Sequence, residues 1–162
     1  MALVEKHCRT TDLTYWRDRI PVNFLYTAGR AGERFFRAMM GGRLLAARCD
    51  SCGKAYLPPR IYCERCFERL EDKFVEVPAR GRVLTWTVCY KNHSGAPLVR
   101  PVIVAFVRID GTDGGLIHYL GEIEPNEVSF DMPVEAVFVP EDERKGTILD
   151  IKYFRKKAEK KD

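Results

Sequence analysis

Hydrophobic and polar residues alternate through much of the second half of the chain, which is the pattern of β-strands that bury one face. Residues 82–90 show it most clearly, because apolar side chains occupy every second position. We assign this set to the core: Leu84, Trp86, Val88 and Tyr90. Residues 102–109 are apolar on both faces except at Arg108, which predicts a central strand.

Three further apolar runs complete a set of five expected strands. They cover residues 116–120, 132–139 and 148–154, and the polar residues 122–129 between the first two of them can hold a single helical turn. Residues 91–101 are rich in Gly and Pro and predict a loop. Five short strands with a small helical insert between the third and the fourth match the order of an OB-fold barrel.

An apolar stripe with spacings of three and four predicts a helix over residues 27–40. Thr27 can cap its first turn through the hydroxyl, and Gly41-Gly42 ends it. Two adjacent Phe and two adjacent Met cover more than one face, so two readings stay open: the helix packs on its own domain, or it docks on another protein. The stripe consists of Phe35, Phe36, Met39 and Met40.

Composition and charge narrow the class of protein. The net charge of +4 is mild, and it allows a phosphate-bearing partner without demanding one. The longest apolar runs are far too short to cross a membrane. Polar residues Glu5, Lys6 and His7 precede any hydrophobic region, so we expect no secretory signal and a reducing cytoplasm as the compartment.

Two C-x-x-C pairs, ten residues apart, dominate the first half of the chain. Cys49 and Cys52 form one pair, and Cys63 and Cys66 form the other. Each pair lies on a tight turn, so four thiolates can point at one ion, and a closed set of four is typical of structural zinc. The spacing also suits a single rubredoxin-type iron. Two disulfides or four buried thiols are the remaining alternative, and a reducing compartment disfavours the disulfides.

No local motif predicts catalysis. The histidines His7, His93 and His118 lie far apart, and the chain has no nucleophile elbow, P-loop or dinucleotide fingerprint. This favours a binding or scaffold module over an enzyme. Basic residues around the cysteine pairs form either a phosphate-binding rim or a solvated one. They are Arg43, Arg48, Lys54, Arg60, Arg65, Arg69 and Lys73.

Several short stretches are informative in combination. They are Tyr26-Thr27-Ala28-Gly29, Phe35-Phe36, Gly42-Arg43-Leu44-Leu45, Arg48-Cys49-Asp50-Ser51-Cys52-Gly53, Pro58-Pro59-Arg60 and Cys63-Glu64-Arg65-Cys66. With residues 81–87 and 101–105 they resemble the DUF35 family, over most of residues 21–154. The family's usual proline after the third metal cysteine is Glu64 here, which leaves the ligand set intact.

The resemblance implies a mostly β protein in which an N-terminal helical arm precedes a rubredoxin-like zinc ribbon and a five-stranded OB-fold barrel. We expect the arm in residues 1–42, the ribbon in 43–77, the barrel in 78–154 and a basic flexible tail in 155–162.

The resemblance also implies a function. Family members act as small, non-catalytic subunits of thiolases and related acyl-CoA enzymes, and they help to enclose CoA. This implies structural Zn²⁺, a thiolase-like protein partner, and CoA or acyl-CoA as a shared ligand. Arg48, Lys54 and Arg60 are the expected CoA phosphate contacts, and the stripe on the expected helix is the expected partner contact. Some members serve aromatic acyl-CoA degradation such as benzoylsuccinyl-CoA thiolysis, but no residue here selects that variant.

Two alternatives belong to other classes. An OB-fold can bind single-stranded nucleic acid through stacking aromatics and a basic groove, for which Trp86 and Tyr90 are the candidates. Both, however, fall on the expected core face. A rubredoxin-like electron carrier is the second alternative, and it requires iron in the four-cysteine site.

Overall fold

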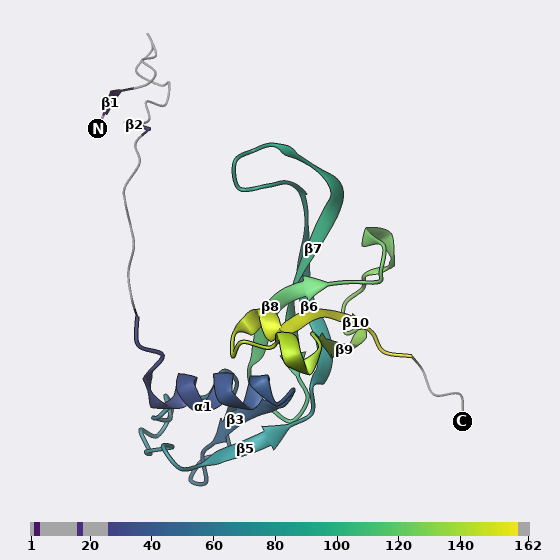
Figure 1. The fold of residues 1–162 in the computed structure, drawn as a ribbon. Coiled ribbons are helices and arrows are strands. Elements are labelled where there is room, and N and C mark those ends of the chain that lie inside the picture. The colour runs from purple at the N-terminus through teal and green to yellow at the C-terminus, as the bar shows by residue number, and fades with distance from the viewer. Residues whose placement is uncertain (1, 4–15, 18–25, 159–162) are drawn as a thin grey trace.

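The computed structural model describes residues 2–3, 16–17 and 26–158 of the chain (Figure 1). Among these residues a single α-helix, α1 (Gly29–Met40), precedes a three-stranded sheet and a closed five-stranded barrel. The sheet has the order β4-β3-β5, with β3 at Leu44–Arg48, β4 at Ala55–Tyr56 and β5 at Phe74–Val77. A separate short pair joins β1 (Ala2–Leu3) to β2 (Trp16–Arg17).

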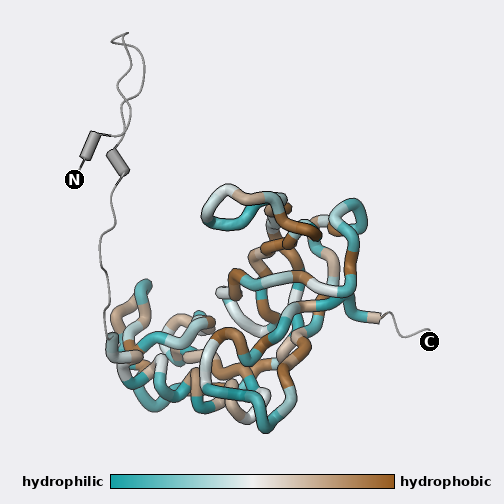
Figure 2. The backbone as a smooth tube through the Cα atoms, turned by 45° about the horizontal axis from the view of Figure 1, so that its top comes forward, coloured by the Kyte–Doolittle hydropathy of each residue, from teal (hydrophilic) through white to brown (hydrophobic). Residues whose placement is uncertain are grey.

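The barrel has the strand order β10-β8-β7-β6-β9, which confirms the expected OB-fold. A 3₁₀ turn, η1 (Pro125–Glu127), fills the expected helical insert between β8 and β9. Figure 2 shows hydrophobic stretches along the barrel strands. The strands are β6 (Arg80–Lys91), β7 (Pro97–Ile109), β8 (Gly115–Leu120), β9 (Pro133–Phe138) and β10 (Ile151–Lys156).

A bulge in β6 changes which side chains reach the core. The register against β7 shifts between Val83 and Thr85, so side chains on the two sides of the shift change phase. Val83 is fully buried, although the sequence pattern placed it opposite the core face. Trp86 packs against the core as expected, but Tyr90 is 65% exposed, so its assignment to the core was wrong.

The strands β6 and β7 are longer than the pattern indicates, and together they project from the barrel as a hairpin (Figure 1). β7 begins at Pro97, where a loop was expected up to residue 101. Proline is tolerated there because this part of β7 has no second neighbouring strand.

The last expected strand also differs from the structure. Its first residues form a 3₁₀ turn, η3 (Ile148–Asp150), and β10 continues to Lys156. Arg155 therefore belongs to the barrel, where it forms an ion pair with Glu135, and the basic tail is shorter than expected.

Helix α1 packs on its own domain. It begins at Gly29, two residues later than expected, and the Thr27 hydroxyl accepts a hydrogen bond from the Gly29 N–H instead of capping the helix. Phe35 and Met39 are buried in the main core, Phe36 packs at its edge, and Met40 is 46% exposed. Direct docking through Phe35 or Met39 is thus excluded in this conformation, and only the Met40 end of the stripe faces solvent.

The three-stranded sheet and the barrel share one core rather than moving as separate bodies. Leu44, Ala46 and Leu57 pack in the same cluster as the barrel side chains. The turn between β7 and β8 is bonded to β4, since the Asp113 N–H donates to the Ala55 carbonyl at 2.7 Å. Gly114 makes this approach possible, because a Cβ there would lie 2.3 Å from the Leu57 carbonyl oxygen. In the described part of the chain, no helix is long and apolar enough to span a membrane.

His118 is a buried histidine of the barrel whose two ring nitrogens are both engaged. Nε2 lies 3.1 Å from the Ile148 carbonyl, and Nδ1 accepts from the Tyr119 N–H at 2.8 Å. The neutral Nε2–H tautomer satisfies both contacts, so a second proton on Nδ1 would face an N–H donor. Burial lowers the pKa of His118 below its ordinary value.

We therefore expect acid to destabilise the fold through His118. A lowered pKa means that the unfolded state takes up the proton first, so the free energy of unfolding falls as the pH drops below about 6.5. Urea unfolding of wild type and of His118→Gln at pH 7.5 and 5.5 measures this, and the variant should lose stability less steeply with acid. Exposed His93 is the matched control, and His93→Gln should behave as wild type. Equal slopes for wild type and His118→Gln would contradict the assignment.

Candidate metal centre and neighbouring pockets

The two C-x-x-C pairs form two turns of the same backbone geometry. In the first turn, the Cys49 N–H donates to the Lys54 carbonyl at 2.8 Å and the Gly53 N–H donates to the Cys49 carbonyl at 2.9 Å. In the second turn, the Cys63 N–H donates to the Glu68 carbonyl at 2.9 Å. The Phe67 N–H donates to the Cys63 carbonyl at 3.0 Å.

Gly53 and Phe67 occupy the same position in these turns, and both have positive φ, at 72° and 58°. The sequence identifies the first as a left-handed position by its glycine. At the second, Phe67 adopts the same conformation with its side chain 79% exposed.

The four cysteine sulfurs meet at one point. They lie within 4.8 Å of one another, as the spacing predicts. Sγ of Cys49 lies 3.4 Å from that of Cys66, and Sγ of Cys52 lies 3.5 Å from that of Cys63. A tetrahedral zinc with bonds near 2.3 Å holds its sulfurs about 3.8 Å apart, which lies between the short sulfur pairs and the 4.8 Å limit of this cluster, so the cluster fits such an ion after small shifts. Cys49 and Cys63 are fully buried, Cys52 is partly buried and Cys66 is exposed, so the centre lies at the surface with one side open to solvent.

A shell of donors surrounds the second turn. The Tyr56 hydroxyl lies 3.2 Å from the Cys63 Sγ in a buried contact, and the Arg65 N–H donates to the same sulfur at 3.4 Å. The bond from Tyr56 lowers the pKa of the Cys63 thiol to about 6, and the same bond raises the pKa of Tyr56 to about 12. A thiolate, the form that binds metal, is thus favoured at this position.

Glu68 holds the two turns together. Its carboxylate accepts from the Cys49 thiol at 2.9 Å and from the Ser51 N–H at 3.0 Å, and it forms an ion pair with Lys73. These contacts, led by that from Cys49, lower the pKa of Glu68 to about 2. Sequence reasoning did not single out Glu68, because nothing in the motif marks a carboxylate two residues after the last cysteine.

The structure brings Lys54 and Arg60 to a cavity of about 310 Å³ between the metal centre and the β7–β8 turn. Lys54 pairs with Asp113 at 2.5 Å, and Arg60 pairs with Glu64, so both charges are partly neutralised. Arg48 lies outside the cavity lining, with a guanidinium nitrogen 3.5 Å from the Gly111 carbonyl. The cavity is lined by Lys54, Tyr56, Leu57, Pro58, Arg60, Glu64, Arg65, Asp113 and Gly114.

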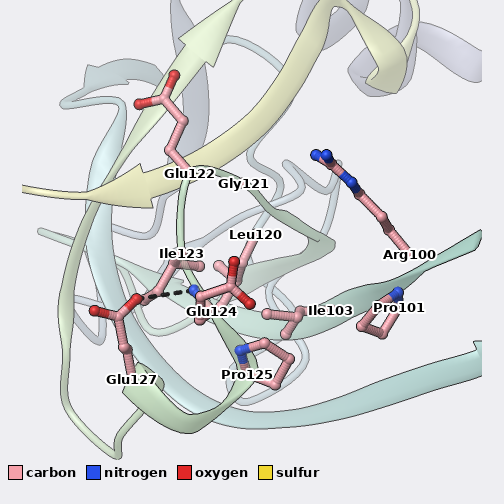
Figure 3. A pocket seen from close by; sticks show the side chains of 10 residues that line it. All are labelled: Arg100, Pro101, Ile103, Leu120, Gly121, Glu122, Ile123, Glu124, Pro125 and Glu127. Carbon is pink, nitrogen blue, oxygen red and sulfur yellow. Dashed lines mark hydrogen bonds between the residues drawn. The ribbon is translucent and has the colours of Figure 1, made fainter.

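A larger cavity of about 630 Å³ lies at one end of the barrel and was not foreseen from the sequence. Figure 3 shows Arg100 on one side of it and the carboxylates of Glu122, Glu124 and Glu127 on the other. One cation against three carboxylates makes this cavity acidic, so it does not suit an anionic ligand. Its walls come from β7, β8 and η1, which only the folded barrel brings together.

Two family descriptions match consecutive parts of the chain. Residues 42–71 match "ChsH2, rubredoxin-like zinc ribbon domain", and residues 74–139 match "ChsH2, C-terminal OB-fold domain". A DUF35 domain-containing scaffold protein of Methanocaldococcus jannaschii is 29% identical over 108 residues, which cover 65% of this chain and 75% of that protein. One of the same name from Pyrococcus furiosus is 30% identical over 96 residues, covering 59% and 68%.

Solved structures share the fold. A DUF35-family protein of unknown function from Sulfolobus solfataricus matches with a TM-score of 0.58 at 29% identity, over 67% of this chain and 78% of that one. A chain of the structure described as an Ltp2-ChsH2(DUF35) aldolase matches with a TM-score of 0.60 at 24% identity, over 85% and 98%. The second likeness supports the fold alone.

We expect Tyr56→Phe to weaken zinc binding by about 10-fold or more, because losing a hydrogen bond to a metal ligand typically costs that much affinity. Competition with a colorimetric zinc chelator measures the change. Tyr62→Phe is the matched control, since Tyr62 lies in the same turn region with its side chain half in solvent. Equal zinc affinities in the two variants would remove Tyr56 from the metal centre.

Proposed function

The chain belongs to the DUF35 family, and on that premise we propose that it is a zinc-containing, non-catalytic subunit that binds a thiolase-type acyl-CoA enzyme. One observation carries the proposal: a four-cysteine ribbon and an OB-fold barrel follow one another on a shared core, in the order of the two ChsH2 domains. Relatives are named scaffold proteins, and a structure of the same fold is named for ChsH2 together with Ltp2.

We propose zinc as the ion of the four-cysteine centre, with a structural role. Four thiolates leave no coordination position open for water or substrate. A colourless protein with one zinc per chain is the expected result of metal analysis, and iron would instead support the electron-carrier alternative. Because free thiolates are needed to bind the ion, we also propose a reducing cytoplasm as the compartment.

We propose that the ribbon side of the molecule helps to hold CoA in the complex. Arg48, Lys54 and Arg60 remain the proposed phosphate contacts, because they lie beside the two cysteine turns in a segment rich in cations. Arg65 adds a positive charge to this proposed phosphate site. It lines the same cavity and forms no ion pair within the described residues. The acidic cavity at the barrel end repels phosphate, which favours the ribbon by comparison.

Single-stranded nucleic acid binding is the second candidate, and the exposure of Tyr90 favours it. An exposed aromatic on a basic hairpin can stack on a base. Trp86 is not available in the same way, because its ring packs edge-on against Phe130 at 4.9 Å.

A tagged pull-down of the full chain from its native cell separates the two candidates. We expect a thiolase-fold chain to co-purify in stoichiometric amount, identified by mass spectrometry. Recovery of the chain alone, or with nucleic acid that is released by salt, would overturn the subunit proposal.

We expect Arg60→Glu to weaken CoA binding by the purified complex by about 10-fold, the loss of one charge-assisted phosphate contact. Titration calorimetry of the complex with CoA measures it. Arg37→Glu is the matched control, because Arg37 also pairs with a glutamate four residues away, on helix α1. Unchanged affinity for Arg60→Glu would remove this residue from the proposed CoA contacts.

A further inference from the structure

One side of the barrel carries a patch of three strands that contains no charged residue. Backbone pairing aligns Thr85 with Phe106 and Phe106 with Ile117, and the next row aligns Thr87, Val104 and Tyr119. These rows alternate with the buried positions of the same strands, so their side chains point away from the core. We call this patch the outer face, and it consists of Thr85, Thr87, Cys89, Val102, Val104, Phe106, Ile117 and Tyr119.

The outer face is apolar but uncovered in the described part of the chain. Ile117 is 71% exposed and Tyr119 is 46% exposed on β8, whereas Val102, Val104 and Phe106 on the central strand are partly buried between their neighbours. The central strand β7 is apolar on both sides, which is the pattern of a strand that is covered on both faces. An exposed apolar patch of several adjacent side chains marks an interaction site more often than a free surface.

The β6–β7 hairpin, which carries six of the eight residues of the outer face, bears charge of one sign. Residues 80–109, which form the β6–β7 hairpin, contain no Asp or Glu, and their cations are Arg80, Arg82, Lys91, Arg100 and Arg108. Lys91 and Arg108 form no ion pair with any described carboxylate, whereas Arg100 lines the acidic cavity at the barrel end. On helix α1 and the ribbon, by contrast, most cations form ion pairs with carboxylates of the same chain. Arg43 pairs with Glu76, for example, and Lys73 pairs with Asp50.

We propose that the outer face is the docking surface for the partner enzyme of the proposed function, on which this inference rests. The complementary surface on the thiolase-type subunit is apolar at its centre and rimmed by carboxylates, which pair with the unmatched cations of the hairpin. A second copy of this chain is a poor occupant, because a two-fold contact would bring identical cations together.

Contact with such a partner would stabilise the projecting β6–β7 hairpin. Beyond the barrel, β6 and β7 pair only with each other among the described strands, and an isolated pair of strands is marginally stable in water. Burying the outer face against a partner would cover the base of this hairpin together with the outward side of β8. The inference thus shifts the expected docking element from helix α1, whose apolar stripe is mostly used internally, to the barrel.

The test uses the full chain and the thiolase-fold subunit that co-purifies with it. We expect Ile117→Asp to weaken the complex by about 30-fold or more, because a charge is placed within an apolar interface at its most exposed side chain. Leu149→Asp is the matched control, since Leu149 is also an exposed apolar residue but lies on η3, away from the outer face. It should bind as wild type, and all variants should retain zinc and melt at the same temperature.

Phe67→Asp separates this inference from the proposed function. If it abolishes binding while Ile117→Asp does not, the partner docks on the ribbon, so the proposed function stands and the outer face is wrong. Failure of the wild-type chain to bind any thiolase-fold subunit would overturn both.

Alkylation of Cys89 gives a readout that needs no substitution. Cys89 belongs to the outer face and is a free, half-buried thiol. In the wild-type complex its alkylation rate, followed by peptide mass spectrometry, should fall several-fold relative to the free chain. An unchanged rate would overturn the docking surface, and protection by a single-stranded oligonucleotide instead of the partner would assign the face to nucleic acid.

Discussion

The convergence of four cysteine sulfurs on one point is the constraint on which the first half of the molecule depends. A ribbon of this size has too few side chains to form a core of its own. Its buried cluster is built around two of the ligands, Cys49 and Cys63, with Tyr56 and Leu70 packed against them. Metal binding therefore supplies the folding free energy that packing cannot, and it fixes the two turns from which the basic side chains project.

The ribbon is packed on the barrel through a shared hydrophobic core. Leu44 and Leu57 place the ribbon sheet in the barrel's core, and Asp113 on the β7–β8 turn bonds to β4 and to Lys54. The proposed CoA side and the outer face are thus held at fixed positions on one body. A scaffold that meets an enzyme with one surface and a ligand with another requires this fixed relation.

Much of this architecture was predicted from the sequence. The cysteine spacing gave the ligand set, and alternation gave the five barrel strands within a few residues, because both signals are local. The short strands β4 and β5 were missed, since β3 decides their pairing and neither has a pattern of its own. The two register shifts in β6 were missed as well. The one after Val83 moved Val83 into the core, and Tyr90 lies at the second, between Cys89 and Lys91, where the hairpin has left the barrel. The sequence left open whether the apolar stripe packs on its own domain or on another protein, and the burial of Phe35 and Met39 in the main core favours the first reading for these two residues.

The sequence by itself determined the metal ligands, the strand order and the family, because each depends on residue type at a fixed spacing along the chain. Only the tertiary structure decided which charges are free and which apolar faces are uncovered. Lys54 meets Asp113 across 59 residues, and Ile117 lies beside Phe106 through β-pairing, so neither relation is visible in local spacing. The exposure of a side chain and the pairing of its charge depend on all the residues that pack around it. Those neighbours are fixed only when the whole barrel has folded.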